Sequence, residues 1–144
     1  MLGRYYPGQT CSAASALELV GERWSLLILR DAFFRGHTRF SDFERSLGIA
    51  PNILTKRLES FVADGLMELR AEPGEAREYH LTEKGRGLKS VIIALNDWGD
   101  RWLQRGPIDY IHRGCGGVIK QTVACECCAK EVPLDEIGVR PRTV

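Results

Sequence analysis

Residues 38–86 carry an ordered series of helix and strand patterns, and this order constrains the fold more than any other feature of the chain. Apolar residues recur at helical spacing around Phe43, and Gly48 is a suitable stop for a first short helix. Residues 41–44 have the sequence of a capping box, which predicts the start of that helix. Pro51 suits the first position of a second helix, because its missing N–H would have no partner there.

The second helix has two different faces. A helical projection predicts a buried apolar stripe formed by Leu54, Leu58, Phe61 and Val62. The opposite face carries Asn52, Lys56, Glu59 and Ala63, with Thr55 and Arg57 on its flanks. This polar face is the candidate recognition surface.

After residue 65 the pattern changes from helical to strand-like. Residues 66–70 and 77–81 predict two strands joined by a turn at Pro73-Gly74, and Thr82 can cap the next helix although Gly85 weakens its start. Two short helices followed by a hairpin are typical of a winged helix-turn-helix, a mainly helical α+β fold that reads duplex DNA. The residues expected to contact DNA are Arg39, Pro51, Asn52, Thr55, Lys56, Arg57 and Arg77.

Several short motifs lie along residues 9–105: GERWSLLILR at 21–30, Arg-Phe at 39–40, Asp-Gly-Leu at 64–66 and EYHLTEKG at 78–85. With Cys11-Ser12 and Arg57-Leu58, they resemble the HxlR family of bacterial winged helix-turn-helix transcriptional regulators. The resemblance implies a homodimer that binds operator DNA, with flanking helices forming the dimer interface. Ala50 departs from the family pattern, which more often has Ser or a similar cap before the recognition helix.

Cys11 lies at or just before the start of the first helix, where backbone N–H groups and the helix dipole favour a negatively charged sulfur. Arg4 is a candidate source of further positive charge. In members of the resembling family a cysteine at this place often senses oxidants or electrophiles, so the resemblance implies a redox-sensor role for Cys11. The alternative is a small, inert packing residue in the dimer interface.

The helices that flank the central block predict an interface. Apolar residues repeat at alternating spacings of three and four along the long final helix, and an exposed seam of this kind would be costly in a monomer. The alternative is that the seam packs on the first helix of its own chain. The predicted dimer interface consists of Trp24, Leu88, Ile92, Leu95, Trp98 and Trp102.

Residues 108–144 differ in character from residues 1–107, and the two segments are expected to form a small Cys-rich tail and the DNA-binding and dimerisation domain. The tail contains four of the five cysteines. Zinc prefers four tetrahedral sulfur and nitrogen ligands, so an H-x2-C pair and a C-x2-C pair at the ends of a hairpin predict a zinc site at His112, Cys115, Cys125 and Cys128. The alternatives are a reduced tail without metal, packed on the body, or a disulfide-labile appendage.

Composition limits the function classes. A formal net charge of +1 means that attraction to phosphate must come from local clusters of basic residues. No apolar run approaches the ~20 residues needed to span a bilayer, and the N-terminus lacks the apolar core of a signal peptide, so we expect a cytoplasmic protein without a membrane partner. The chain contains no H-E-x-x-H, G-x-S-x-G or Gly-rich phosphate loop, which argues against an enzyme.

The function expected from the sequence is that of a regulator that binds double-stranded DNA sequence-specifically as a homodimer on a palindromic operator. Cys11 would make it responsive to oxidants or electrophiles, and the inducer is left open. Two alternatives remain at this point. One is a zinc-containing adaptor or RNA-binding module, and the other is a regulator controlled by a small-molecule effector and not by thiol chemistry.

Overall fold

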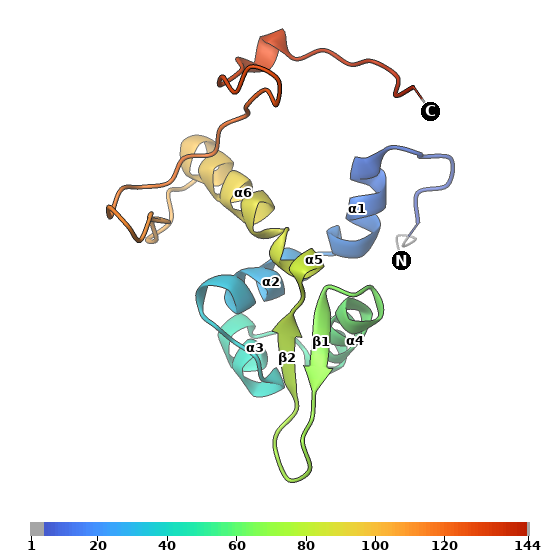
Figure 1. Ribbon diagram of the computed structural model, residues 1–144. Helices are drawn as coiled ribbons and strands as arrows, with labels where there is room; N and C mark the ends of the chain where they lie inside the picture. Colours follow the sequence, from blue (N-terminus) through green and yellow to red (C-terminus); the bar gives the residue numbers. More distant parts are fainter. Residues whose placement is uncertain (1–4, 144) are drawn as a thin grey trace. The chain divides into compact units, whose positions relative to one another are not determined.

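The computed structural model describes residues 5–143 and contains two compact units that divide between Ile92 and Ile93. The first unit holds a helix-turn-helix and a two-stranded wing (Figure 1). The elements in chain order are α1 Ser12–Val20, α2 Ser25–Phe34, α3 Phe40–Leu47, α4 Pro51–Ala63, β1 Met67–Arg70, β2 Glu78–Leu81, α5 Glu83–Arg86, α6 Lys89–Trp102 and the short 3-10 helix η1 Leu134–Glu136. This arrangement confirms the predicted mainly helical winged helix-turn-helix fold.

The turn between α3 and α4 follows the local signals of the sequence. Gly48 ends α3 in the left-handed conformation, with φ 61°, and its N–H donates to the Glu44 carbonyl at 2.9 Å. Pro51 occupies the first position of α4, as predicted. Ala50 precedes it and gives no side-chain hydrogen bond to the helix end, so the departure from the family pattern leaves α4 without a side-chain cap.

The predicted start of α3 is wrong. The helix begins at Phe40, and Arg39 holds the cap position without a side-chain hydrogen bond, so Ser41 lies inside the helix. The reason is tertiary, because the backbone of Arg39 is extended and forms an antiparallel bridge with Glu78 of β2. The helix therefore starts where this pairing ends.

The wing is a two-stranded antiparallel sheet in which Met67 pairs with Leu81 and Arg70 with Glu78. The turn that joins its strands is closed by the Glu75 N–H, which donates to the Glu72 carbonyl at 3.0 Å. β2 is also bonded to the segment before α3, since the Tyr79 N–H donates to the Thr38 carbonyl at 2.7 Å. These bonds fix the wing relative to the helix-turn-helix.

The core of the first unit lies where α2, α3, α4 and β1 meet. Its buried apolar side chains come from α1 to α4, from β1 and α6, and from the turns on either side of α4. They are Val20, Ile28, Leu29, Phe43, Ile49, Leu54, Leu58, Phe61, Leu66, Met67 and Ile92. Ile92 is the last core residue along α6, which explains why the units divide there, whereas the sequence analysis placed the domain boundary after residue 107.

One carboxylate is fully buried at the junction of α2 and α3. Asp31 accepts a hydrogen bond from Ser46 Oγ at 2.6 Å and another from Arg30 Nε at 2.9 Å. Arg35 Nη1 in turn donates to Ser46 Oγ at 3.1 Å. Two guanidinium groups and a hydroxyl thus compensate the desolvated charge and hold α3 on α2.

Gly85 explains how the wing is joined to α5. Thr82 caps this helix as predicted, since its Oγ1 accepts from the Gly85 N–H at 3.1 Å. A Cβ atom at Gly85 would lie 2.1 Å from the Leu66 carbonyl oxygen, so only glycine allows the backbone of α5 to pass so close.

Within residues 5–143, no helix is long and apolar enough to cross a bilayer.

Candidate nucleic-acid interface

The exposed face of α4 matches the predicted recognition surface. Leu54, Leu58 and Phe61 are fully buried, while residues on the opposite side of the helix are open to solvent. The exposed residues of this side include Pro51, Asn52, Thr55, Lys56, Glu59 and Ala63. Thr55 Oγ1 donates back to the Pro51 carbonyl at 2.9 Å, so its oxygen lone pairs remain available as acceptors.

The cations near this face divide into paired and unpaired groups. Arg39 Nε lies 3.5 Å from Glu78 Oε1. Arg57 Nε lies 3.8 Å from Glu22 Oε2. The Arg57 side chain is only 22% exposed, which places it on the flank of α4 against the turn between α1 and α2. Among the residues that the structure describes, Lys56 and Arg77 are exposed and form no ion pair. They are therefore the cations of the predicted set that are free to meet phosphate or base edges.

Arg45 is a cation that the sequence analysis did not single out. It lies exposed in the last turn of α3. In helix-turn-helix complexes the first helix crosses the DNA backbone, so a cation on this helix can reach a phosphate. The sequence signal was a basic residue in the turn before Gly48, which also suits the helix dipole and therefore did not indicate DNA by itself.

Glu78 in β2 is the acidic residue that pairs with His80 and Arg39. His80 Nε2 lies 2.8 Å from its carboxylate, and Arg39 lies on the other side. The hydrogen bond from His80, followed by the charges of His80 and Arg39, lowers the pKa of Glu78 below its ordinary value. The carboxylate is thus ionised at neutral pH and orients Arg39 at the edge of the interface.

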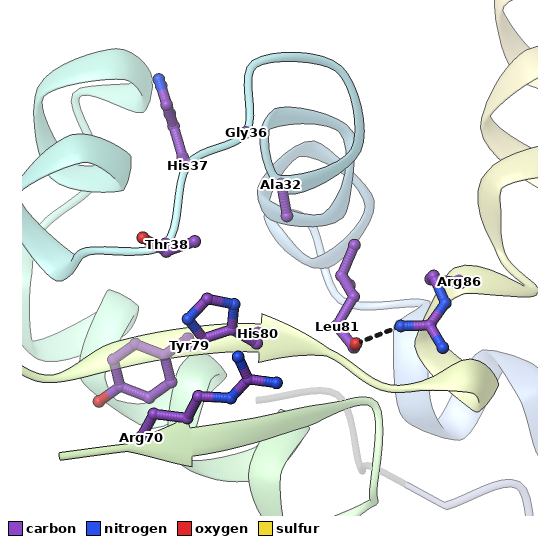
Figure 2. A pocket seen from close by; sticks show the side chains of 9 residues that line it. All are labelled: Ala32, Gly36, His37, Thr38, Arg70, Tyr79, His80, Leu81 and Arg86. Carbon is purple, nitrogen blue, oxygen red and sulfur yellow. Dashed lines mark hydrogen bonds between the residues drawn. The ribbon is translucent and has the colours of Figure 1, made fainter. Parts of the chain in front are cut away.

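A shallow hollow of about 280 Å³ lies between the loop before α3 and the inner part of the wing (Figure 2). Its cationic side chains already have partners in the protein. Arg86 Nη1 donates to the Leu81 carbonyl at 2.8 Å, Arg70 pairs with Glu68, and His80 pairs with Glu78. The hollow therefore offers an effector few unengaged charged groups.

The predicted dimer residues fall into two groups. Ile92 is buried in the core of its own chain, and Leu88 and Trp24 are half-buried against that core. Further along α6, Leu95, Trp98 and Trp102 are 52%, 57% and 62% exposed. Together with exposed Val91 these three residues form one stripe, here called the α6 stripe.

Cys11 caps α1, as its predicted position required. Its Sγ accepts a hydrogen bond from the Ala14 N–H at 3.4 Å, and the residue is exposed. The thiol is therefore open to reagents and faces the positive end of a helix dipole. Arg4, the other candidate charge, lies outside the described residues.

The tail forms two short loops in place of a single hairpin. An isolated bridge between Ile111 and Val118 closes the first loop, and one between Ala124 and Glu131 closes the second. The first contains His112 and Cys115, and the second Cys125 and Cys128. The structure thus brings the four predicted ligands together in pairs.

Comparisons with known proteins agree with this geometry. Residues 19–107 match the HxlR-like helix-turn-helix family. An "uncharacterized HTH-type transcriptional regulator" of Mycobacterium tuberculosis strain H37Rv is 42% identical over 136 residues, which cover 90% of this chain and 85% of that protein. A helix-turn-helix with a wing and an open recognition helix defines the class of DNA-binding transcriptional regulators, a class distinct from enzymes. Within that class, the chain belongs to the HxlR-like family.

Solved structures support the same assignment. The crystal structure of PA1607, described as a candidate transcription factor, superposes with a TM-score of 0.84 at 34% identity and covers 94% of this chain and 97% of PA1607. The redox regulator HypR in its reduced form has a TM-score of 0.56 at 28% identity, covering 63% of this chain and 92% of HypR. HypR has also been solved in its oxidised form.

Proposed function

We propose that the chain is a sequence-specific transcriptional regulator that binds a palindromic operator as a homodimer. α4 enters the major groove, and the tip of the wing contacts the flanking backbone. The observation that carries this proposal is the open face of α4, on which Lys56 is exposed and unpaired while the opposite side of the helix is buried. Family membership supports it, because the family consists of DNA-binding regulators.

The chemistry of the α4 face suits direct readout. Residues at the start of a recognition helix reach base edges, and Asn52 and Thr55 occupy the first turns of α4. An Asn amide can pair with adenine through two hydrogen bonds, and a lysine ammonium can meet either guanine or a phosphate. Arg77 comes just before β2 at the outer part of the wing, where a cation suits a phosphate.

We expect Lys56→Ala and Arg77→Ala each to weaken operator binding without unfolding the protein, because both side chains are exposed and unpaired within the described chain. If Lys56 reads a base, discrimination at one operator position drops by about 1–3 kcal/mol. If it meets a phosphate, all sequences bind more weakly and the salt slope flattens by about one unit. Titrations of labelled duplexes at several salt concentrations measure both quantities.

Lys89→Ala is the matched control for these variants. It removes the same charge from the first residue of α6. The tip of the wing lies at the end of the first unit that is far from the start of α6, so Lys89 is distant from that tip (Figure 1). We expect this control to bind like the wild type. Full operator affinity of the Lys56→Ala/Arg77→Ala double variant at physiological salt would exclude this face as the DNA-binding surface.

We further propose that Cys11 makes operator binding responsive to oxidants or electrophiles. The support is its exposed thiol at the N-terminus of α1, and the similarity to HypR, a redox regulator solved in reduced and oxidised forms. Modification at this position adds a bulkier group to the sulfur that caps the helix. The change would act on α1 and through it on the assembly of two chains.

We expect alkylation of Cys11 by iodoacetamide to change operator affinity, and Cys11→Ser to abolish that response. Serine is a good N-cap, so this variant keeps the hydrogen bond to the Ala14 N–H and removes only the sulfur chemistry. Mass spectrometry of the modified peptide, followed by duplex titration, links the two events. If neither alkylation nor the Cys11→Ser substitution changes the operator affinity, the proposed thiol response is wrong and the inducer is to be sought among small-molecule effectors.

A further inference from the structure

The two loops of the tail have the same backbone hydrogen bonds at equivalent positions. In the first, the Gly116 N–H donates to the His112 carbonyl at 2.7 Å, and the His112 N–H donates to the Gly117 carbonyl at 2.8 Å. In the second, the Ala129 N–H donates to the Cys125 carbonyl at 2.8 Å, and the Cys125 N–H donates to the Lys130 carbonyl at 2.9 Å. Each loop, here called a knuckle, therefore presents two side chains three residues apart from one tight turn.

The position after each pair has the same left-handed backbone. Gly116 has φ 74° and Ala129 has φ 57°. Within the described chain Ala129 is the sole non-glycine residue with positive φ, a conformation that is unfavourable for a residue with a Cβ. It lies in an exposed turn where no apolar burial offsets that cost. Strain of this kind is typical of a functional turn.

The donor atoms in each knuckle are arranged as ligands. His112 Nδ1 lies 3.3 Å from Cys115 Sγ. Zn–N and Zn–S bonds of about 2.0 and 2.3 Å at a tetrahedral angle separate the two donors by about 3.5 Å, so this pair already has nearly the spacing of two zinc ligands. A Cβ at Gly114 would lie 3.0 Å from the His112 ring, so glycine leaves room for the imidazole over the turn.

In the second knuckle, backbone N–H groups of Cys128 and Cys127 point to the Cys125 sulfur. The Cys128 side chain also hydrogen-bonds with Cys125, so the two cysteines of this pair lie in contact. Cys127 is exposed and lies between the two residues that would act as ligands.

The tail also needs a source of stability. No residue of the segment 103–143 is fully buried, so this part of the chain has no apolar core. Segments of this size that lack a core are commonly stabilised by a structural metal. Soft thiolates combined with an imidazole favour zinc over magnesium or calcium.

We propose that the two knuckles of one chain close on a single zinc ion held by His112, Cys115, Cys125 and Cys128. In the described chain no three ligating side chains are gathered at one point, so binding requires the two pairs to approach each other. The segment 118–124 that joins them spans at most roughly 25 Å, which keeps the pairs at a high effective concentration. This site is independent of the proposed DNA-binding function.

The test uses the full chain, purified without chelator. We expect about one zinc ion per chain, and we expect cobalt(II) in its place to give the intense visible bands of a tetrahedral thiolate site. Cys115→Ser and Cys128→Ser should each lose the metal during competition with a chromogenic chelator. Cys127→Ser is the matched control, because it removes an adjacent thiol outside the ligand set, and it should retain zinc.

A variant-free measurement guards against misfolded mutants. Chelation of the wild type should expose Lys120 and Lys130 to trypsin, and one equivalent of zinc should restore protection. Zinc-free protein with all five thiols reactive, a disulfide among the tail cysteines, or equal metal loss in Cys127→Ser would each overturn the proposal. Mixing Cys115→Ser chains with Cys128→Ser chains tests the intrachain geometry, since recovery of metal in the mixture would show a site shared between chains.

Discussion

Gly85→Ala is expected to destabilise the protein by about 3 kcal/mol, at the upper end of the usual cost of overpacking. The new Cβ would lie 2.1 Å from the Leu66 carbonyl oxygen. The oxygen is a backbone atom and the backbone also fixes the position of the Cβ, so neither atom can rotate away. Relief requires α5 to move from the end of β1, which also strains the Thr82 cap. Urea unfolding measures the change in free energy, and thermal unfolding should show a midpoint lower by roughly 10 °C.

Gly87→Ala is the control for this prediction, because the two glycines lie two residues apart at the same short helix. A Cβ at Gly87 would meet its nearest neighbour, the Lys84 carbonyl oxygen, at 3.3 Å, and the backbone there is helical. A small adjustment offsets the gain in helix propensity, so we expect a change within about 1 kcal/mol. Equal stability of the two variants would show that the close approach of α5 to β1 is not rigid.

If the chain forms the proposed homodimer, Leu95→Arg is expected to convert it into a monomer. Leu95 lies in the middle of the α6 stripe, whose members are 41–62% exposed in the single chain. Burial of such side chains is worth roughly 1.5–3 kcal/mol each, and a guanidinium without a partner would be costly in the same contact. Sedimentation velocity at micromolar concentration measures the change of mass.

Loss of the dimer should also weaken binding to a palindromic operator by roughly 100-fold or more, because two half-sites would no longer be engaged together. Ser90→Arg adds the same charge at an exposed position of α6 outside the stripe, and this control should leave both mass and affinity unchanged. A wild-type chain that sediments as a monomer, yet binds the palindrome tightly, would contradict the homodimer proposal.

Local signals in the sequence predicted the elements that depend on local chemistry. Gly48, Pro51 and Thr82 act on their own turns of helix, and each has the predicted role in the structure. The wing strands were predicted within one residue of their bounds, because the strand pattern and the turn of residues 72–75 agree. The capping box at Ser41 failed, since the backbone pairing of Arg39 with Glu78 sets the start of α3 from a distant part of the chain.

The candidate site shows the same division. Helical periodicity was enough to place Lys56 on the open face of α4, whereas the pairing of Arg57 with Glu22 depends on how α4 packs beside the turn between α1 and α2. Both residues are basic and adjacent, so composition alone treats them alike. The structure separates them because only one lies within reach of a carboxylate.

The sequence by itself determined the class of fold, the exposed polar face of α4 and the spacing of the His and Cys residues in the tail, because periodicity, turn chemistry and residue spacing act over a few residues. Only the tertiary structure decided which parts of α6 join the core, which cations remain unpaired and why Gly85 must be glycine. Each of these depends on groups far apart in the chain that approach within a few ångströms. Such distances follow from packing, and packing is not encoded in any single segment.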